Sequence, residues 1–190
     1  DNIFDSGVWG QEDSTTFGGT AHVIHPMQNG RVGIAGSLYS VDAFSPFIGK
    51  GGHANVDYAL VALEGQYNLD HWTFFGQGGW FGDIRGCDGR EGCVHDGVFF
   101  RGNAMYFFAP NTSLAFDGKL FWADDELFGS VSGGTARLEG EYRFTDSMYS
   151  GFVAVEYERE DVDVGFGTAG QDTTSINAGL RIYFDSTTVQ

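Results

Sequence analysis

The sequence predicts an all-β protein built from a single antiparallel, up-and-down meander of long strands. Apolar and polar residues alternate with a period of two over most of the chain, and no window of about eleven residues keeps a helical apolar stripe free of glycine. The connections between these segments are alternately short and long. We therefore expect one domain over residues 1–190, in which residues 1–12 form either the first strand or an N-terminal extension.

Composition excludes several classes of protein. Glycine accounts for 30 of 190 residues and aromatic residues for 16%, but the glycines have no triplet period, so the chain is not collagen-like. A chain so rich in Phe, Tyr and Trp is not disordered either. The net charge of −16 and the absence of a basic patch argue against a nucleic-acid partner.

Nine strands can be identified from the alternation. The clearest is residues 135–144, where Ala136 and Leu138 alternate with Arg137 and Glu139. The other segments are 17–23, 32–38, 53–68, 72–80, 98–108, 113–122, 151–158 and 175–184. Within residues 53–68 the phase changes between Ala59 and Leu63, which predicts a β-bulge.

The connections predict how the strands are arranged. Residues 26–30, 68–71, 109–112 and 145–147 form the short turns, and residues 41–52, 83–97, 124–130 and 159–172 form the longer loops. All short turns then lie at one end. The last strand also finishes there, so an even strand count requires the segment Ile3–Gly10 to supply a tenth strand. We predict ten strands, with eight as the alternative.

Three features favour a transmembrane barrel whose apolar face contacts lipid. Strands of about 10 to 13 residues match a tilted membrane-spanning strand. The polar face is rich in Arg and Glu but almost free of Lys, and a closed barrel leaves no strand edge in lipid. Aromatic residues near the strand ends are expected to form two interfacial girdles, to which we assign Tyr67, Trp72, Trp80, Phe108, Trp122, Tyr142, Phe144, Tyr149, Tyr157 and Phe184.

The segment from Ser175 to Phe184 resembles the last strand of bacterial outer-membrane β-barrels, especially porin-like barrels of alphaproteobacterial type. This resemblance implies a mature chain that starts at Asp1 after removal of a signal peptide and lies in the outer membrane. Its partners would be outer-membrane lipid, lipopolysaccharide and the barrel-assembly machinery, which reads the terminal aromatic residue. The implied function is a narrow porin-like channel for small ions or solutes, or a structural surface protein.

Ten charged residues on the polar strand faces are expected to line the lumen, and we call them the charge ladder. They could form a constriction that selects solutes, or a salt-bridged plug that fills a narrow interior; the small size of the barrel favours the plug. The ladder consists of Arg101, Asp117, Lys119, Arg137, Glu139, Glu141, Arg143, Glu156, Glu158 and Arg181.

Two other classes of function remain open. One is a lipid A-modifying barrel enzyme, which needs a nucleophile, a base and an orienting acid. The polar-face residue His22 could pair with a serine across the barrel, but no Ser-His-acid set shares one strand face, so we expect no catalytic residues. The other is a secreted soluble β-barrel that binds an apolar ligand.

The remaining motifs are in the predicted long loops. Cys87 and Cys93 enclose five polar and glycine residues, a spacing that predicts a disulfide and an oxidising compartment rather than a zinc site. The acidic runs 124–126 and 158–163 could hold a divalent cation between lipopolysaccharide phosphates, but they match no calcium loop, so we interpret them as solvated charges. We therefore expect neither a metal nor a cofactor.

Overall fold

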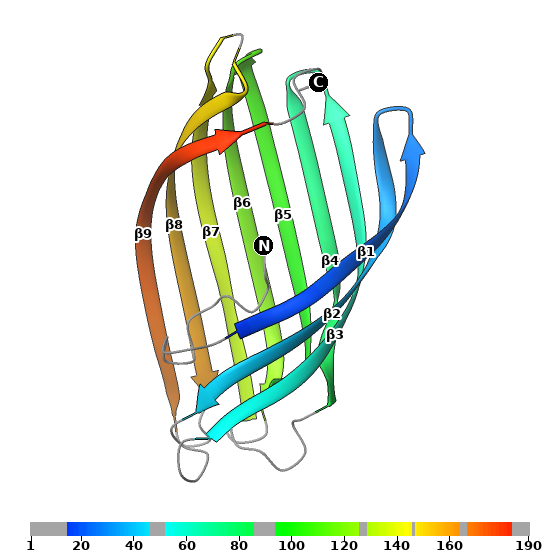
Figure 1. Cartoon of the computed structure of the whole chain (residues 1–190), viewed down its shortest axis with the longest axis vertical. Coiled ribbons are helices and arrows are strands. Elements are labelled where there is room, and N and C mark those ends of the chain that lie inside the picture. The colour runs from blue at the N-terminus through cyan, green and yellow to red at the C-terminus, as the bar shows by residue number, and fades with distance from the viewer. Residues whose placement is uncertain are drawn as a thin grey trace.

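The computed structural model describes residues 15–45, 52–85, 94–125, 129–145, 147–163 and 167–183. These residues form nine strands in one antiparallel sheet, in which the strands follow one another in sequence order (Figure 1). No helix in these residues is long and apolar enough to cross a membrane. The strands are β1 (Thr15–Met27), β2 (Gly30–Ser45), β3 (Gly52–Leu69), β4 (Trp72–Arg85), β5 (Val94–Ala109), β6 (Thr112–Asp125), β7 (Gly129–Arg143), β8 (Tyr149–Asp163) and β9 (Thr168–Ile182).

The meander and its four short turns are confirmed. Residues 28–29, 70–71, 110–111 and 144–148 connect β1 to β2, β3 to β4, β5 to β6 and β7 to β8, and these turns lie together at the top of Figure 1. Asp70, in the turn between β3 and β4, has a φ of 45°. Asp is one of the few residues other than glycine that readily adopts this left-handed conformation in a two-residue hairpin.

The strands extend further into the predicted long loops than the sequence indicated. Pairing between β7 and β8 continues to Ser130 and Asp163, and that between β8 and β9 starts at Thr168. The prediction ended these strands where apolar alternation ends. A backbone ladder can continue beyond that point, because its hydrogen bonds do not require an apolar face. The acidic residues 158–163 therefore belong to β8 and not to a loop. Asp124 and Asp125 likewise belong to β6.

The predicted bulge between Ala59 and Leu63 is wrong. Both neighbours pair with this part of β3 without interruption, and the register with β4 shifts only between Asp57 and Tyr58. The change of phase has another cause: Leu60 is on the concave face of the sheet and is 4% exposed, whereas Leu63 on the convex face is 68% exposed. Both faces of this strand are apolar, so hydrophobicity alone cannot show its phase.

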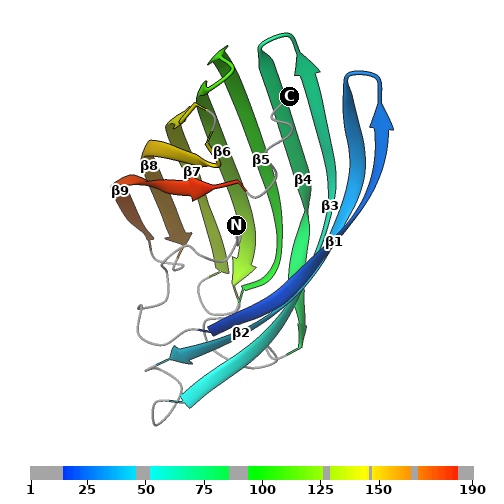
Figure 2. The same ribbon diagram turned by 45° about the horizontal axis from the view of Figure 1, so that its top comes forward.

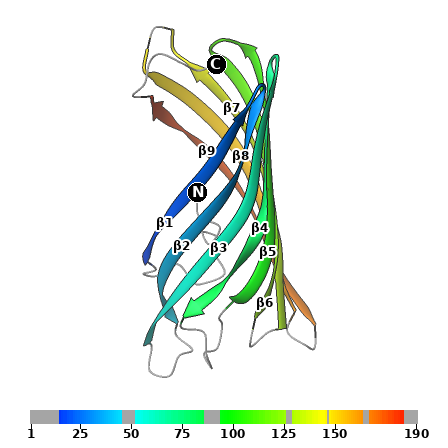
Figure 3. The same ribbon diagram turned by 90° about the vertical axis from the view of Figure 1, so that its right-hand side faces the viewer.

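The sheet curls into a trough, with β1 and β9 as its edges (Figures 1 and 2). Seen from the side, β1, β2 and β3 run obliquely to the long axis of the molecule (Figure 3). Each strand pairs with its neighbours in sequence, and no pairing joins β1 to β9 among the described residues, so closure into a barrel is not observed. The predicted tenth strand, Ile3–Gly10, lies outside the described residues.

Candidate functional site on the concave face

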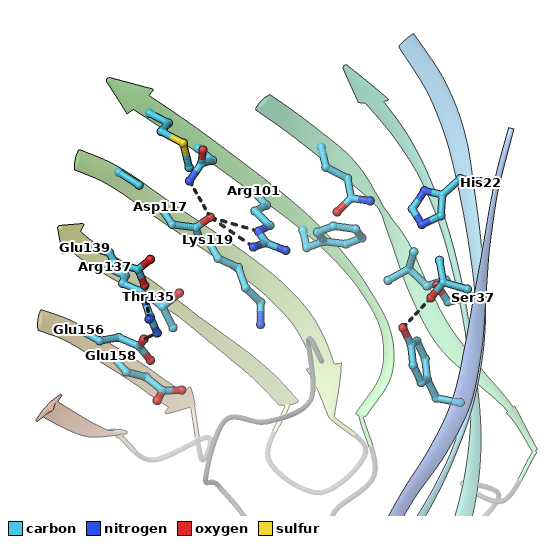
Figure 4. A pocket seen from close by; sticks show the side chains of 18 of the residues that line it. His22, Ser37, Arg101, Asp117, Lys119, Thr135, Arg137, Glu139, Glu156 and Glu158 are labelled. Carbon is cyan, nitrogen blue, oxygen red and sulfur yellow. Dashed lines mark hydrogen bonds and ion pairs between the residues drawn. The ribbon is translucent and has the colours of Figure 1, made fainter. Parts of the chain in front are cut away.

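The concave face of the sheet carries the polar side chains. The register aligns Asp117 of β6 with Arg137 of β7 and Arg137 with Glu156 of β8, so that opposite charges lie side by side across three strands. A cavity of about 890 Å³ lies against this face. Eight of the ten ladder residues line it, and side chains from β1 and β2 face them across the trough (Figure 4).

Arg137 and Arg181 connect the acidic residues of the ladder. Arg181 Nη2 lies 2.8 Å from Glu139 Oε2, and Arg181 Nη1 lies 2.6 Å from Glu141 Oε2. Arg137 donates to Glu139 as well and lies 3.1 Å from Glu156. The structure thus brings together these five predicted residues, from β7, β8 and β9, in one ion-pair network.

The rest of the ladder is placed around this network. Arg101 pairs with Asp117 at 3.3 Å. The Lys119 ammonium lies 5.9 Å from the centre of the Phe121 ring. Arg143 is apart from the carboxylates of the network: its Nε donates to the main-chain oxygen of Ser147, and its guanidinium lies over the Tyr183 ring. Glu158 lines the cavity.

The network also includes polar groups that the sequence analysis missed. The hydroxyls of Ser150 and Tyr183 both donate to Glu141. Ser150 is fully buried, and it pairs with Arg181 across β8 and β9. Period-two alternation from Arg181 to Tyr183 already put the tyrosine on the polar face, which is the one signal that could have identified it.

A second polar group lies on the opposite wall. His22 Nδ1 of β1 is 2.9 Å from Glu64 Oε1 of β3, and Gln77 reaches the other oxygen of Glu64. Thr20, next to His22 on the same face, bonds to the hydroxyl of Ser37 at 2.8 Å. The sequence did not predict the pairing of His22 with Glu64, because 42 residues separate them in the chain.

An apolar cluster on the concave face was also missed. Residues of β2 to β6 form it, and their exposed fractions are 0–6% for all but the partly buried Phe121. We call it the apolar belt: Ala35, Leu60, Ala62, Phe81, Phe99, Phe121 and Ala123. Glu160 of β8 lies beside it, opposite Gly133, and its Oε1 is buried with no hydrogen-bond partner in the described residues.

The middle of the convex face is apolar, and the described members of the predicted girdles lie on this face. Trp72 packs against Tyr106 with 4.8 Å between ring centres, and Phe100 packs against Trp122 with 6.3 Å between ring centres. Every described girdle residue is exposed. Between the two girdles, the described convex positions of β4 to β9 carry no charged side chain.

Some predicted residues lie outside the described part of the chain. These are Phe184 and both members of the predicted disulfide, Cys87 and Cys93, whose pairing stays a prediction. Within the described residues, no group of three or more His, Cys, Asp or Glu side chains is arranged to hold a metal ion.

The comparisons with known proteins identified no relative. No protein-family model, curated protein or solved structure matches the chain.

Proposed function

We propose that this chain is a small outer-membrane β-barrel whose concave face forms the wall of a narrow channel for small ions or solutes. One observation carries the proposal: between the two girdles, the described convex face is apolar and uncharged, whereas the concave face that a barrel would enclose carries the ion-pair network. Ile176 and Leu180 of β9 are 76% and 72% exposed. Large apolar side chains gain free energy when such a surface is covered by lipid.

The spacing of the aromatic girdles supports a membrane. Trp72 and Trp80 lie on the same face of β4, eight residues apart in the chain. At about 3.3 Å per residue they are about 26 Å apart along the strand. A spanning strand in an outer-membrane barrel has about 9–11 residues and is inclined to the membrane normal.

The other classes receive less support. A soluble barrel that binds an apolar ligand would have its apolar face inside, whereas here the enclosed face carries most of the charges and the convex face is apolar. A lipid-modifying enzyme needs a nucleophile next to His22. In the described residues the Ser37 hydroxyl bonds to Thr20 and not to that histidine. A structural surface protein would share the proposed architecture but conduct no ions.

The lipid-facing assignment can be tested with a matched pair of substitutions in β9. Leu180→Arg places a charge on the convex face, and we expect it to lower the free energy of unfolding by about 2–4 kcal/mol. Asn177→Arg, on the concave face three residues away, should cost much less, because its side chain faces the polar interior. Urea titration of the protein folded into phosphatidylcholine vesicles measures both.

Leu138→Arg, on the convex face of β7, repeats the test in a second strand and should behave like Leu180→Arg. Equal losses for Leu180→Arg and Asn177→Arg, or a parent protein that stays soluble and folded without detergent or lipid, would contradict the proposal.

A further inference from the structure

The concave face has two sections that differ in exposure. Several side chains of the ladder are partly exposed: those of Arg101, Arg137 and Arg181 are 31–35% exposed, and that of Glu156 is 30% exposed. The apolar belt is buried. Phe99 is 1% exposed, although its neighbour two residues along β5 is Arg101.

The belt crosses several strands at one level of the register. Ala35 pairs with Ala62, and Phe99 pairs with Phe121. Two residues further along β3 and β4, towards the strand ends that carry the longer connections, Leu60 pairs with Phe81. The belt therefore continues from β2 to β6, on the side of Arg101 and Lys119 away from the short turns.

The cavity against the concave face meets the belt. Leu60 and Phe99 belong to its lining, together with the charged side chains of the ladder. A solute that moves from the short turns along the part of the wall formed by β2 to β6 therefore leaves a section lined with ion pairs and passes a section lined with aliphatic and aromatic carbon.

Such a section opposes the passage of ions. A hydrated ion loses much of its solvation where the wall offers no hydrogen-bonding group, and that loss is costly. Apolar constrictions in channels can empty of water and block conduction for this reason. Ion pairs in a hydrated section oppose an ion less, because its water shell is retained.

We propose that the apolar belt, with Phe99 at its centre, is the barrier that limits ion passage through this protein, whereas the charge ladder sets the preference between cations and anions. This inference rests on the proposed channel function. It departs from the expectation that the ladder itself is the plug.

Single-channel recording in planar phosphatidylcholine bilayers with potassium chloride tests the barrier. We expect Phe99→Ser to raise the conductance severalfold, and Phe99→Leu to leave it unchanged because the wall stays apolar. Phe100→Ala is the control, since this adjacent residue is on the convex face and is 58% exposed; it should conduct like the parent. Phe121→Ser provides a second site in the belt if Phe99→Ser fails to fold.

Substitutions in the charge ladder test the second half of the inference, the preference between cations and anions. Replacing Arg137 and Arg143 together by Gln should shift the reversal potential in a salt gradient towards cation selectivity, with little change in conductance. Folded Phe99→Ser or Phe121→Ser protein with the parent's conductance would overturn the inference, as would a large rise in conductance in the arginine variant. If the parent does not fold into vesicles, the proposed function fails as well; the urea titration of the parent reports this independently of any current.

Discussion

Glu160 is the residue whose environment departs most from that of a solvated carboxylate. It follows the predicted girdle residue Tyr157 by three positions in β8 and so lies outside the part of that strand between the two predicted girdles. Burial, with a smaller contribution from the charge of Glu158, raises the pKa of Glu160 from 4.5 to about 7. The residues opposite it, Gly133 of β7 and Gln171 of β9, are uncharged and provide no cation to pair with its ionised form.

This environment predicts how stability depends on pH. Because the pKa is raised in the folded state, protonation of Glu160 favours folding fully below pH 4.5, and this contribution is lost as the pH rises to about 7. We expect Glu160→Gln to remove that part of the pH dependence, so that the variant gains stability relative to the parent between pH 5 and pH 7.

Urea titrations of both proteins at several pH values measure this difference. Asp161→Asn is the control. Asp161 is the next residue on β8 but pairs with Arg159 at 2.9 Å, and its replacement should not remove the loss of stability between pH 5 and pH 7. A parent and a Glu160→Gln variant with parallel pH profiles would contradict the burial of this carboxylate.

Arg181 is the most connected cation of the network, and its loss should be costly. Arg181→Met leaves Glu139 and Glu141 with fewer donors, and we expect it to lower the free energy of unfolding by about 2 kcal/mol. Arg159→Met removes an ion pair whose arginine side chain is 62% exposed, and it should cost much less than Arg181→Met. Urea titration in vesicles compares the two variants. Equal losses in the free energy of unfolding would mean that the network contributes no more than a surface ion pair.

At the scale of elements, the strands differ in how well alternation defines them. The faces of β7, β8 and β9 follow directly from the sequence, because each has apolar residues on one face and charged or polar residues on the other. In β3 the apolar belt adds Leu60 and Ala62 to the concave face, so both faces are apolar and the predicted bulge was wrong. The ends of the strands were underestimated, because hydrogen bonding continues beyond the apolar band.

At the scale of the whole molecule, the number of strands constrains how the sheet can close. The nine strands alternate in direction, so the edge strands β1 and β9 run the same way. One further strand between them, antiparallel to both, would close the sheet and pair the backbone groups of both edges, which lipid requires. The segment that directly precedes β1 is the candidate for this strand, as the sequence predicted.

Deleting residues 2–12 tests this closure. We expect the shortened chain to fold poorly into vesicles, because two unpaired edges would remain in lipid; the loss of the folded band in unheated electrophoresis and of the β-sheet circular dichroism signal would report it. Deleting residues 186–190, which follow the predicted last strand, is the matched control and should leave folding intact. Normal folding of the chain without residues 2–12 would show that this segment is an extension and that the sheet closes differently.

The sequence by itself determined the all-β class, the antiparallel up-and-down meander and the four short turns, because these depend on period-two alternation and on local turn residues. It could not determine which carboxylate each arginine pairs with, the contact between His22 and Glu64, or the apolar belt with Glu160 beside it. These depend on the register between strands and on the curl of the sheet. Only the tertiary structure brings residues such as Arg181 and Glu139, which are 42 positions apart in the chain, within hydrogen-bonding distance.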